Sequence, residues 1–344
     1  MHLQPRYNIY IRGMKVLIIR FSSIGDIVLT TPVVRCVKNQ IPGAVIHYLT
    51  KYEYRHIVQP NPYISKVHLL QNNLEQLIQD LKAEKFDYII DLHKNLRTAK
   101  VKRALKKTSS FSYDKLNWEK WLLTNFKINQ MPPIHIVDRY LNTVKSLGVT
   151  NDQVGLDYFI PERELVKESD IPMSHQAGFI GLVIGASYAT KKLPTEKLVV
   201  LCSLIAHPII LLGGPEDKTT GDTVAAANPD KIYNACGKFT LNESADLVRR
   251  SKLIISHDTG LMHIAAAFKK PVISVWGNTV TAFGMTPYFG NTAPPNAIFQ
   301  IEKLGCRPCS KLGYQQCPRK HFKCMNNISM NAIAEKVAAF LKTS

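Results

Sequence analysis

Apolar runs and polar turns alternate along most of the chain, in the order expected of strands that are each followed by a helix. Lys15–Arg20 has the pattern of a buried strand, residues 21–26 that of a tight turn, and the apolar positions after them recur at helical spacing. The same alternation predicts strands over Val45–Leu49, Val67–Leu70 and Tyr88–Asp91, with a helix over about Leu74–Ala83. Repeated strand–helix units imply a parallel, doubly wound sheet.

The alternation is interrupted between about Gly148 and Gln176, where we expect a linker between two domains. A second series follows the linker. It predicts strands over Phe179–Ile184, Ile209–Leu212, Lys252–Ser256 and Val272–Gly277, with helices over about Thr195–Ala206 and Leu261–Phe268. We therefore expect a leader over residues 1–13, a first Rossmann-like domain over 14–160 and a second over 161–328.

Two such domains face each other across a cleft. Ligands of doubly wound folds bind at the carboxyl ends of the strands. This rule places the chemistry in the loops that follow Arg20, Ile184, Leu212, Ser256 and Trp276.

The composition is that of an ordinary globular protein. With 344 residues, 45% of them hydrophobic and 20% charged, the chain suffices for about two domains and is neither a disordered tail nor a disulfide-rich miniprotein. No apolar run approaches the ~18 residues of a membrane-spanning helix, and the first residues lack the apolar stretch of a signal peptide. We therefore expect a soluble, intracellular protein.

The charge balance favours a polyanionic partner, such as nucleic acid, anionic lipid headgroups or a phosphorylated substrate. The chain has 44 Lys and Arg residues against 26 Asp and Glu, a net charge of +18. Lys94–Lys107 alone holds seven cations and no anion. As a helix, this segment, with Lys94, Arg97 and Lys100 in its first half, suits an anionic membrane surface or a phosphorylated glycolipid. A solvated charged face and nucleic-acid binding fit the same run.

The turn Ser22-Ser23-Ile24-Gly25-Asp26 places a carboxylate between a strand and a helix. It lacks the G-x-G-x-x-G fingerprint, which argues against a nicotinamide cofactor. The positive end of a helix favours the ionised form of Asp26, which would make this carboxylate a proton acceptor at neutral pH. The alternative is that Asp26 only caps its helix.

Two loops of the second half are candidate ligand sites. In the segment from His257 to His263, the backbone N–H groups around Thr259 and Gly260 would point at an anion placed at the start of the next helix. Gly185–Pro194 begins with small residues and then carries Lys191, which could neutralise a departing diphosphate. A plain capped turn and solvated lysines are the alternatives.

The seven cysteines are an odd number in a chain without an export signal, which argues against a disulfide framework. Four thiolates could bind zinc, namely Cys306, Cys309, Cys317 and Cys324. Because only one C-x-x-C pair is present, reduced structural thiols are favoured over zinc.

Together these motifs resemble glycosyltransferase family 9, the ADP-heptose:lipopolysaccharide heptosyltransferases. The resemblance runs from about Met14 to Met325 and rests on the S-S-x-G-D turn at 22–26, the D-T-G-x-x-H-x-A-A element at 258–266 and the C-x-P-C and C-P pieces at 306–309 and 317–318. It implies a GT-B architecture, in which the acceptor is bound mainly by the first domain and the sugar nucleotide by the second. It also implies that the last helix, within 329–344, packs back on the first domain.

The resemblance further implies an inverting transfer without a metal or other cofactor. It makes Asp26 the general base for the acceptor hydroxyl and Lys191 the residue that stabilises the departing diphosphate. The donor pocket that it implies consists of Gly185, Ser187, Glu216, Asp258, Thr259, Gly260 and His263. The acceptor or its anionic surface would contact Ser22, Ser23, Gly25, Lys94, Arg97 and Lys100.

We therefore expect an enzyme that moves heptose, or a related sugar, from ADP-heptose to the inner core of a lipopolysaccharide. Its acceptor would be linked to lipid A, and the enzyme would associate peripherally with the cytoplasmic face of the inner membrane; no nucleic-acid partner is expected. The alternatives from other classes are a basic, zinc-containing nucleic-acid-binding protein and a nicotinamide-dependent oxidoreductase.

Overall fold

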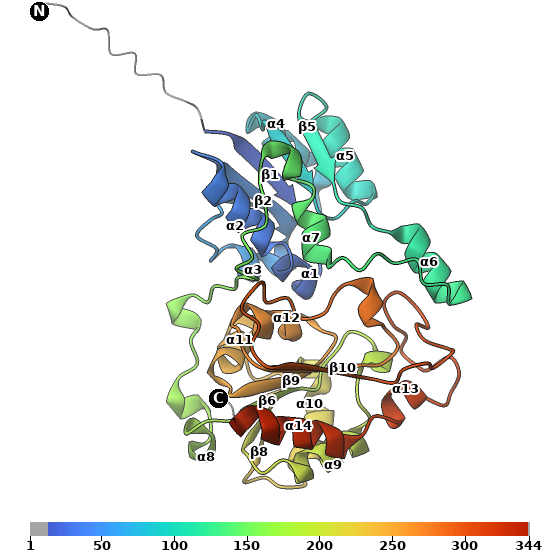
Figure 1. Cartoon of the computed structure of the whole chain (residues 1–344). Helices are drawn as coiled ribbons and strands as arrows, with labels where there is room; N and C mark the ends of the chain where they lie inside the picture. The colour runs from blue at the N-terminus through green and yellow to red at the C-terminus, as the bar shows by residue number, and fades with distance from the viewer. Residues whose placement is uncertain (1–12, 343–344) are drawn as a thin grey trace, which may run out of the picture.

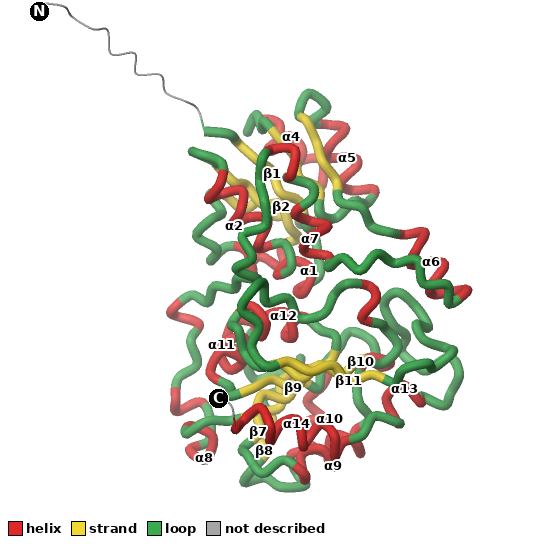
Figure 2. Tube along the Cα trace, viewed as in Figure 1, coloured by secondary structure: helices red, strands yellow, loops and turns green. Residues whose placement is uncertain are grey.

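The computed structural model describes residues 13–342, which form two α/β domains stacked on each other (Figure 1). Residues 1–12 and 343–344 lie outside the described residues, and with them all of the predicted leader except Gly13. Each domain has a parallel sheet at its centre, with helices and loops around it (Figure 2). The predicted fold class, two doubly wound parallel sheets, is confirmed.

The first domain is built on a five-stranded sheet of order β3-β2-β1-β4-β5. Its strands are β1 (Lys15–Ile19), β2 (Val45–Lys51), β3 (Lys66–Leu70), β4 (Tyr88–Asp91) and β5 (Ser109–Ser112). Its helices are α1 (Ile24–Val28), α2 (Thr31–Gln40), α3 (Arg55–Val58), α4 (Leu74–Ala83), α5 (Leu96–Ala104), α6 (Asn117–Phe126) and α7 (Ile136–Leu141).

The central strand β1 shows why this part of the sequence is a continuous apolar run. Its side chains alternate between the two faces of the sheet. Val16 and Ile18 belong to the core that includes residues of α1, α2 and α7, whereas Leu17 and Ile19 belong to a second core with residues of α4 and α5. Both faces are therefore covered by helices, as in other parallel sheets.

The second domain has a six-stranded parallel sheet of order β11-β10-β9-β6-β7-β8. Its strands are β6 (Ile180–Val183), β7 (Ile209–Leu212), β8 (Ile232–Asn234), β9 (Leu253–His257), β10 (Val272–Trp276) and β11 (Asn296–Gln300). Its helices are α8 (Met173–Gln176), α9 (Thr195–Leu204), α10 (Lys218–Ala225), α11 (Leu241–Arg250), α12 (Gly260–Ala267), α13 (Lys323–Asn326) and α14 (Met330–Lys342). None of the helices in residues 13–342 has the length and hydropathy needed to cross a bilayer.

The chain crosses from the first domain to the second near Asp157, inside the predicted linker. Arg35 of α2 forms ion pairs with Asp152, at 2.7 Å, and with Asp157. The next residue, Tyr158, donates a hydrogen bond of 2.6 Å from its hydroxyl to Asn242 of α11. The crossing is thus anchored in one domain at its start and in the other at its end.

Helix α14 packs on the second domain, which corrects the prediction that the C-terminal helix returns to the first. It lies against α9 and β9 (Figure 1). Its residues Ile333 and Val337 are buried in one core with Leu198 and Cys202 of α9. The physical reason is that the apolar side of α14 completes the cover of this sheet, which the spacing of apolar residues alone does not reveal.

Candidate functional site

The two domains meet where α1 of the first approaches α12 of the second. The contact is close because glycine occupies both helices: a Cβ atom on Gly25 would lie 2.7 Å from the imidazole Cδ2 of His263. A Cβ on Gly260 would lie 2.6 Å from a methyl carbon of Ile24. Larger residues would therefore hold the helices apart.

Beside this contact lies a cavity of about 710 Å³ that is lined by both domains. It opens at the carboxyl ends of β1, β5, β6, β7, β9 and β10, the edge where ligands of such sheets bind. The predicted site residues that line it are Ser23, Gly25, Asp26, Gly185, Ser187, Lys191, Glu216, Asp258, Thr259, Gly260 and His263. Segments that are far apart in the sequence thus contribute to one cavity.

Asp26 lies in the first-domain wall, in the first turn of α1. It accepts hydrogen bonds from the Ser23 backbone N–H at 3.2 Å and from the Ser23 hydroxyl at 2.9 Å, so it does help to cap its helix. Its other oxygen forms an ion pair of 2.7 Å with Arg20. Burial alone would raise the pKa of the Asp26 carboxyl, but Arg20 and the Ser23 hydrogen bonds outweigh it and hold this pKa below its usual value. The carboxylate is therefore ionised at neutral pH.

Arg20 is the partner that the sequence analysis missed. It is buried, and it donates hydrogen bonds to the backbone oxygens of Ser22, at 2.7 Å, and Leu92, at 2.6 Å. It also donates to the Tyr140 hydroxyl at 2.9 Å. The available signal is a cation directly after a buried strand, a position from which its side chain reaches the end of the sheet. Ser22 was predicted to contact the sugar acceptor. It is not among the residues that line the cavity, and its carbonyl group accepts the hydrogen bond from Arg20.

On the second-domain wall, Lys191 and Asp258 form an ion pair. The Lys191 Nζ lies 2.6 Å from Asp258 Oδ2, and the same carboxylate oxygen accepts a hydrogen bond of 2.9 Å from the Thr279 hydroxyl. Asp258 follows β9 and stands two residues before α12, whose first residues, Gly260 and Leu261, line the cavity. A cation and a helix N-terminus therefore lie together on this wall, which is the combination that stabilises an anionic leaving group.

His263 lies between the two walls and is neutral. Burial lowers its pKa to about 4. Its Nδ1 atom is buried, and residues 13–342 provide no hydrogen-bond partner for it.

Three further lysines line the cavity without having been predicted: Lys115, Lys120 and Lys311. Burial, followed by the nearby Arg139, lowers the pKa of Lys120 to about 8. The predicted cations Lys94, Arg97 and Lys100 are exposed on the segment that enters and forms α5, outside the cavity. The positive charge of the cavity thus comes from residues outside the cationic run Lys94–Lys107.

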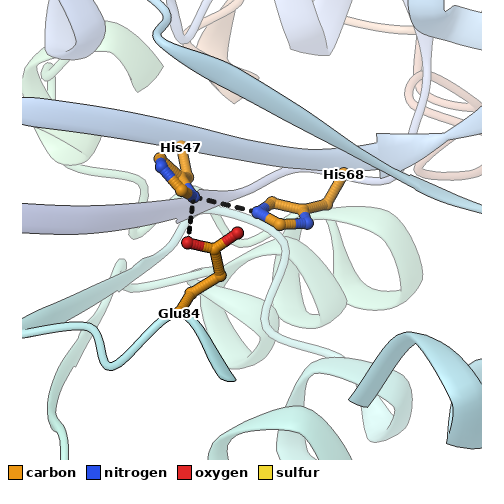
Figure 3. Close-up of side chains that lie close together, drawn as sticks. All are labelled: His47, His68 and Glu84. Carbon is orange, nitrogen blue, oxygen red and sulfur yellow. Dashed lines mark hydrogen bonds and ion pairs between the residues drawn. The ribbon is translucent and has the colours of Figure 1, made fainter. Parts of the chain in front are cut away.

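One group of three potential metal ligands occurs in residues 13–342, outside the cavity, and consists of His47, His68 and Glu84 (Figure 3). His47 Nδ1 lies 3.0 Å from His68 Nε2 and 3.8 Å from a Glu84 oxygen. Both oxygens of Glu84 are already paired, one with Lys15 at 3.0 Å and the other with Lys66 at 2.5 Å. Two ammonium groups on one carboxylate disfavour a metal ion, so we interpret this cluster as an ion-pair network.

All seven cysteines are free thiols, in agreement with the expected absence of a disulfide framework. In the segment considered for zinc, Cys306 Sγ lies 3.9 Å from His321 Nε2 and the Cys309 thiol donates to the Cys306 carbonyl at 3.1 Å. Among residues 13–342, no three ligand atoms of this segment gather within 4.8 Å of one another. Burial raises the pKa of Cys324 to about 12 and keeps this thiol protonated.

Two Rossmann-like domains with a charged cavity between them define a protein of the GT-B class. A family model described as glycosyltransferase family 9 (heptosyltransferase) matches residues 74–313. The chain therefore belongs to glycosyltransferase family 9. This membership favours glycosyl transfer over the nucleic-acid-binding and oxidoreductase alternatives.

Curated relatives agree with this assignment. The chain is 27% identical over 311 residues to lipopolysaccharide heptosyltransferase 1 of Campylobacter coli, covering 82% of this chain and 87% of that protein. It is 26% identical over 280 residues to lipopolysaccharide heptosyltransferase 3 of Escherichia coli strain K12, covering 75% and 81%.

Solved structures show the same fold. A glycosyltransferase family 9 protein from Veillonella parvula superposes with a TM-score of 0.74 at 21% identity, covering 96% of this chain and 98% of that chain. ADP-heptose lipopolysaccharide heptosyltransferase II of E. coli superposes with a TM-score of 0.75 at 17% identity, covering 96% and 99%.

Proposed function

We propose that this protein transfers heptose, or a closely related sugar, from ADP-heptose to the inner core of a lipopolysaccharide, with inversion at the anomeric carbon. The proposal rests on one observation: two charged residues line one cavity from opposite domains. One is the ionised carboxylate of Asp26, and the other is Lys191, which pairs with Asp258 just before the start of α12. A direct displacement needs a base on one side of the reacting carbon and leaving-group stabilisation on the other.

Asp26 is the proposed general base. The acceptor hydroxyl oxygen attacks the anomeric carbon, its proton passes to the Asp26 carboxylate, and the bond between that carbon and the diphosphate oxygen breaks. Because the nucleophile and the leaving group occupy opposite faces of the carbon, its configuration inverts. The pair with Arg20 keeps Asp26 ionised but makes it a weak base, so proton transfer occurs late, when the attacking oxygen has become acidic.

Lys191 is the proposed electrostatic partner of the leaving diphosphate. When a donor enters, its phosphate oxygens compete with Asp258 for the Lys191 ammonium group, and the backbone N–H groups at the start of α12 supply further positive charge. These groups offer charge neutralisation without a metal ion, and transfer is expected to persist in excess EDTA. Glu216, in the loop after β7, is the proposed contact of the nucleoside.

Lys115, Lys120 and Lys311 provide the cavity with cations suited to a phosphorylated, lipid-linked acceptor. We place the enzyme in the cytoplasm, at the cytoplasmic face of the inner membrane, where such an acceptor would be embedded. The net charge of +18 favours an anionic surface of this kind.

The test is ADP release from ADP-heptose in the presence of a lipopolysaccharide core acceptor. Asp26→Asn should lower kcat by about 10²–10⁴-fold, the usual contribution of a general base, and leave the Kd for the donor nearly unchanged. The exposed Asp230→Asn, the same chemical change in the second domain, is the matched control. Asp26→Asn with normal turnover would refute the assignment of the base, and a product that retains the donor's anomeric configuration would refute inversion.

A further inference from the structure

Helix α6 carries its three aromatic side chains on the side that faces away from the protein. Trp118, Trp121 and Phe126 are 63%, 40% and 57% exposed, respectively. The two indole rings stack with their centroids 4.9 Å apart, and the Phe126 ring meets Trp121 edge-on at 5.0 Å. These three rings form one continuous surface, which we call the aromatic face of α6.

The opposite side of the same helix carries a lysine toward the protein. Lys120 is half-buried and lines the cavity, whereas neither tryptophan lines it. Leu123 of α6 is buried as well, as expected for the inward side of a surface helix, but the larger aromatic residues of α6 lie on its outward side. An exposed cluster of large aromatic side chains marks an interaction surface.

The position of α6 is fixed by contacts with the second domain. Lys127, which directly follows the helix, donates a hydrogen bond of 2.8 Å to the backbone oxygen of Pro308. Lys311 donates to the backbone oxygen of Asn117, the first residue of the helix, at 3.4 Å. Figure 1 shows α6 standing out to the side of both domains, at the level where they meet. The aromatic face is therefore held next to the cavity.

The sequence around α6 is strongly basic. The segment from Lys94 to Lys127, which includes α5 and α6, holds ten Lys and Arg residues and two acidic ones, Asp114 and Glu119. Aromatic rings favour the headgroup level of a bilayer, and an amphipathic helix with flanking cations lies in the plane of an anionic membrane surface. The pattern of α6 and its flanks meets both conditions.

We propose that the aromatic face of α6 docks on an anionic lipid bilayer, with Trp118, Trp121 and Phe126 at the headgroup level and the neighbouring cations against anionic headgroups. This inference deepens the proposed function and rests on it for its purpose, because docking at α6 would bring the cavity to a lipid-linked acceptor. Binding to lipid itself is measurable without any sugar transfer.

The tryptophans allow a direct test. The chain has three, and the third, Trp276, is buried at 1% exposure. Vesicles of phosphatidylcholine with phosphatidylglycerol should shift the tryptophan emission of the full chain to shorter wavelength. Lipids brominated on their acyl chains should quench it. The variant Trp118→Phe/Trp121→Phe should still bind these vesicles, with emission from Trp276 alone that neither shifts nor is quenched.

The double variant Trp118→Ser/Trp121→Ser should sediment with the same vesicles about 10- to 100-fold more weakly, because two large side chains no longer leave water. Met173→Ser on α8 removes another exposed apolar side chain, 85% accessible, far from this surface in sequence, and is the matched control. Vesicle affinity should also fall with added salt and with the omission of phosphatidylglycerol.

Several results would overturn the proposal. One is equal vesicle binding by the wild-type chain and Trp118→Ser/Trp121→Ser, and another is bound wild-type chain whose emission is not quenched by brominated lipid. A third is self-association in sedimentation velocity that disappears in the double variant, which would assign the face to a second copy of the chain. A chain that docks on vesicles but releases no ADP from ADP-heptose would refute the proposed function and leave the docking surface standing.

Discussion

Arg20 and Asp26 form an ion pair of 2.7 Å in the wall of the interdomain cavity, with the guanidinium group more buried than the carboxylate. Arg20 is also fixed by hydrogen bonds to the end of β4 and to α7, so the cation cannot follow the carboxylate if the latter moves. Asp26, the proposed base, is thus held in one orientation. Its protonation is controlled by Arg20, which lies outside the S-S-x-G-D motif.

Weakening this pair should move the acid limb of the pH profile. Burial favours the neutral form of Asp26, and Arg20 opposes it, so Arg20→Lys, with a less well-placed charge, should raise the pKa of Asp26. In the wild-type chain, activity that depends on ionised Asp26 should be lost only at pH values below the usual pKa of a carboxyl group. In the variant, the acid limb of kcat/KM should appear at higher pH, and an unchanged limb would contradict the role of Arg20.

Removing the positive charge of Lys191 should slow the chemical step more than it weakens donor binding. Lys191→Met leaves Asp258 with Thr279 as its remaining partner and should lower kcat by about 10²–10³-fold, the usual loss for one electrostatic stabiliser. Lys167→Met, at an exposed position of the linker, is the matched control. Single-turnover rates with saturating ADP-heptose separate the two effects. A variant that loses only donor affinity would speak against leaving-group stabilisation.

The glycines at the contact of α1 and α12 set how closely the domains approach. Gly25→Ala would place a methyl group 2.7 Å from the His263 ring, and the domains or the ring must shift to accept it. We expect a lower kcat and a larger radius of gyration in solution scattering with donor bound. Gly305→Ala, at a glycine with nothing within 4 Å of its added Cβ, should behave as the wild type in both measurements.

The cluster of His47, His68 and Glu84 should make the first domain sensitive to acid. Burial lowers the pKa of His47, and it lowers that of His68 to about 4, below the unfolded value near 6.5. The unfolded chain therefore binds more protons as the pH falls from 7 to 4, and the free energy of unfolding decreases, by at most about 3 kcal/mol for His68.

Glu84 extends this loss to lower pH. Its hydrogen bond from Lys66 is the main reason that its pKa falls to about 2, so its contribution is present above the unfolded value near 4.5 and disappears as the pH falls toward 2. Urea denaturation at several pH values measures both effects. His68→Gln, which cannot take up a proton, should show a flatter dependence between pH 7 and 4, and equal slopes would argue against this account.

Much of the fold is predictable from the sequence because the central strands are long apolar runs. The predicted bounds of α4, β4 and β7 match the structure, those of β1 and β10 differ from it by one residue at the C-terminal end, and β9 is displaced by one residue at both ends. The edge strands β5, β8 and β11 are not predicted, because they are partly exposed and lack a continuous apolar run, whereas the edge strand β3 has such a run over Val67–Leu70 and is predicted. Helix α6 is missed for a related reason: its aromatic residues face outward and only Leu123 is buried, so its pattern does not indicate a helix packed on a core.

The candidate site is predictable where a motif concentrates several features in a few residues, as around Asp26 and Asp258. Thr279 and Lys120 come from separate segments that only the topology brings together, and their local sequence carries no distinguishing pattern. Arg20 directly follows a buried strand, but the sequence does not show that its side chain pairs with Asp26. The place of α14 is likewise decided by which surface is left uncovered once both sheets have formed.

Because α14 stays with the second domain, the backbone of residues 13–342 passes between the domains once, near Asp157. Each half of the proposed active site is consequently encoded by one uninterrupted stretch of gene. Recombination at that single junction could join a different acceptor-recognising half to an unchanged nucleotide-sugar half while preserving the strand order of both sheets.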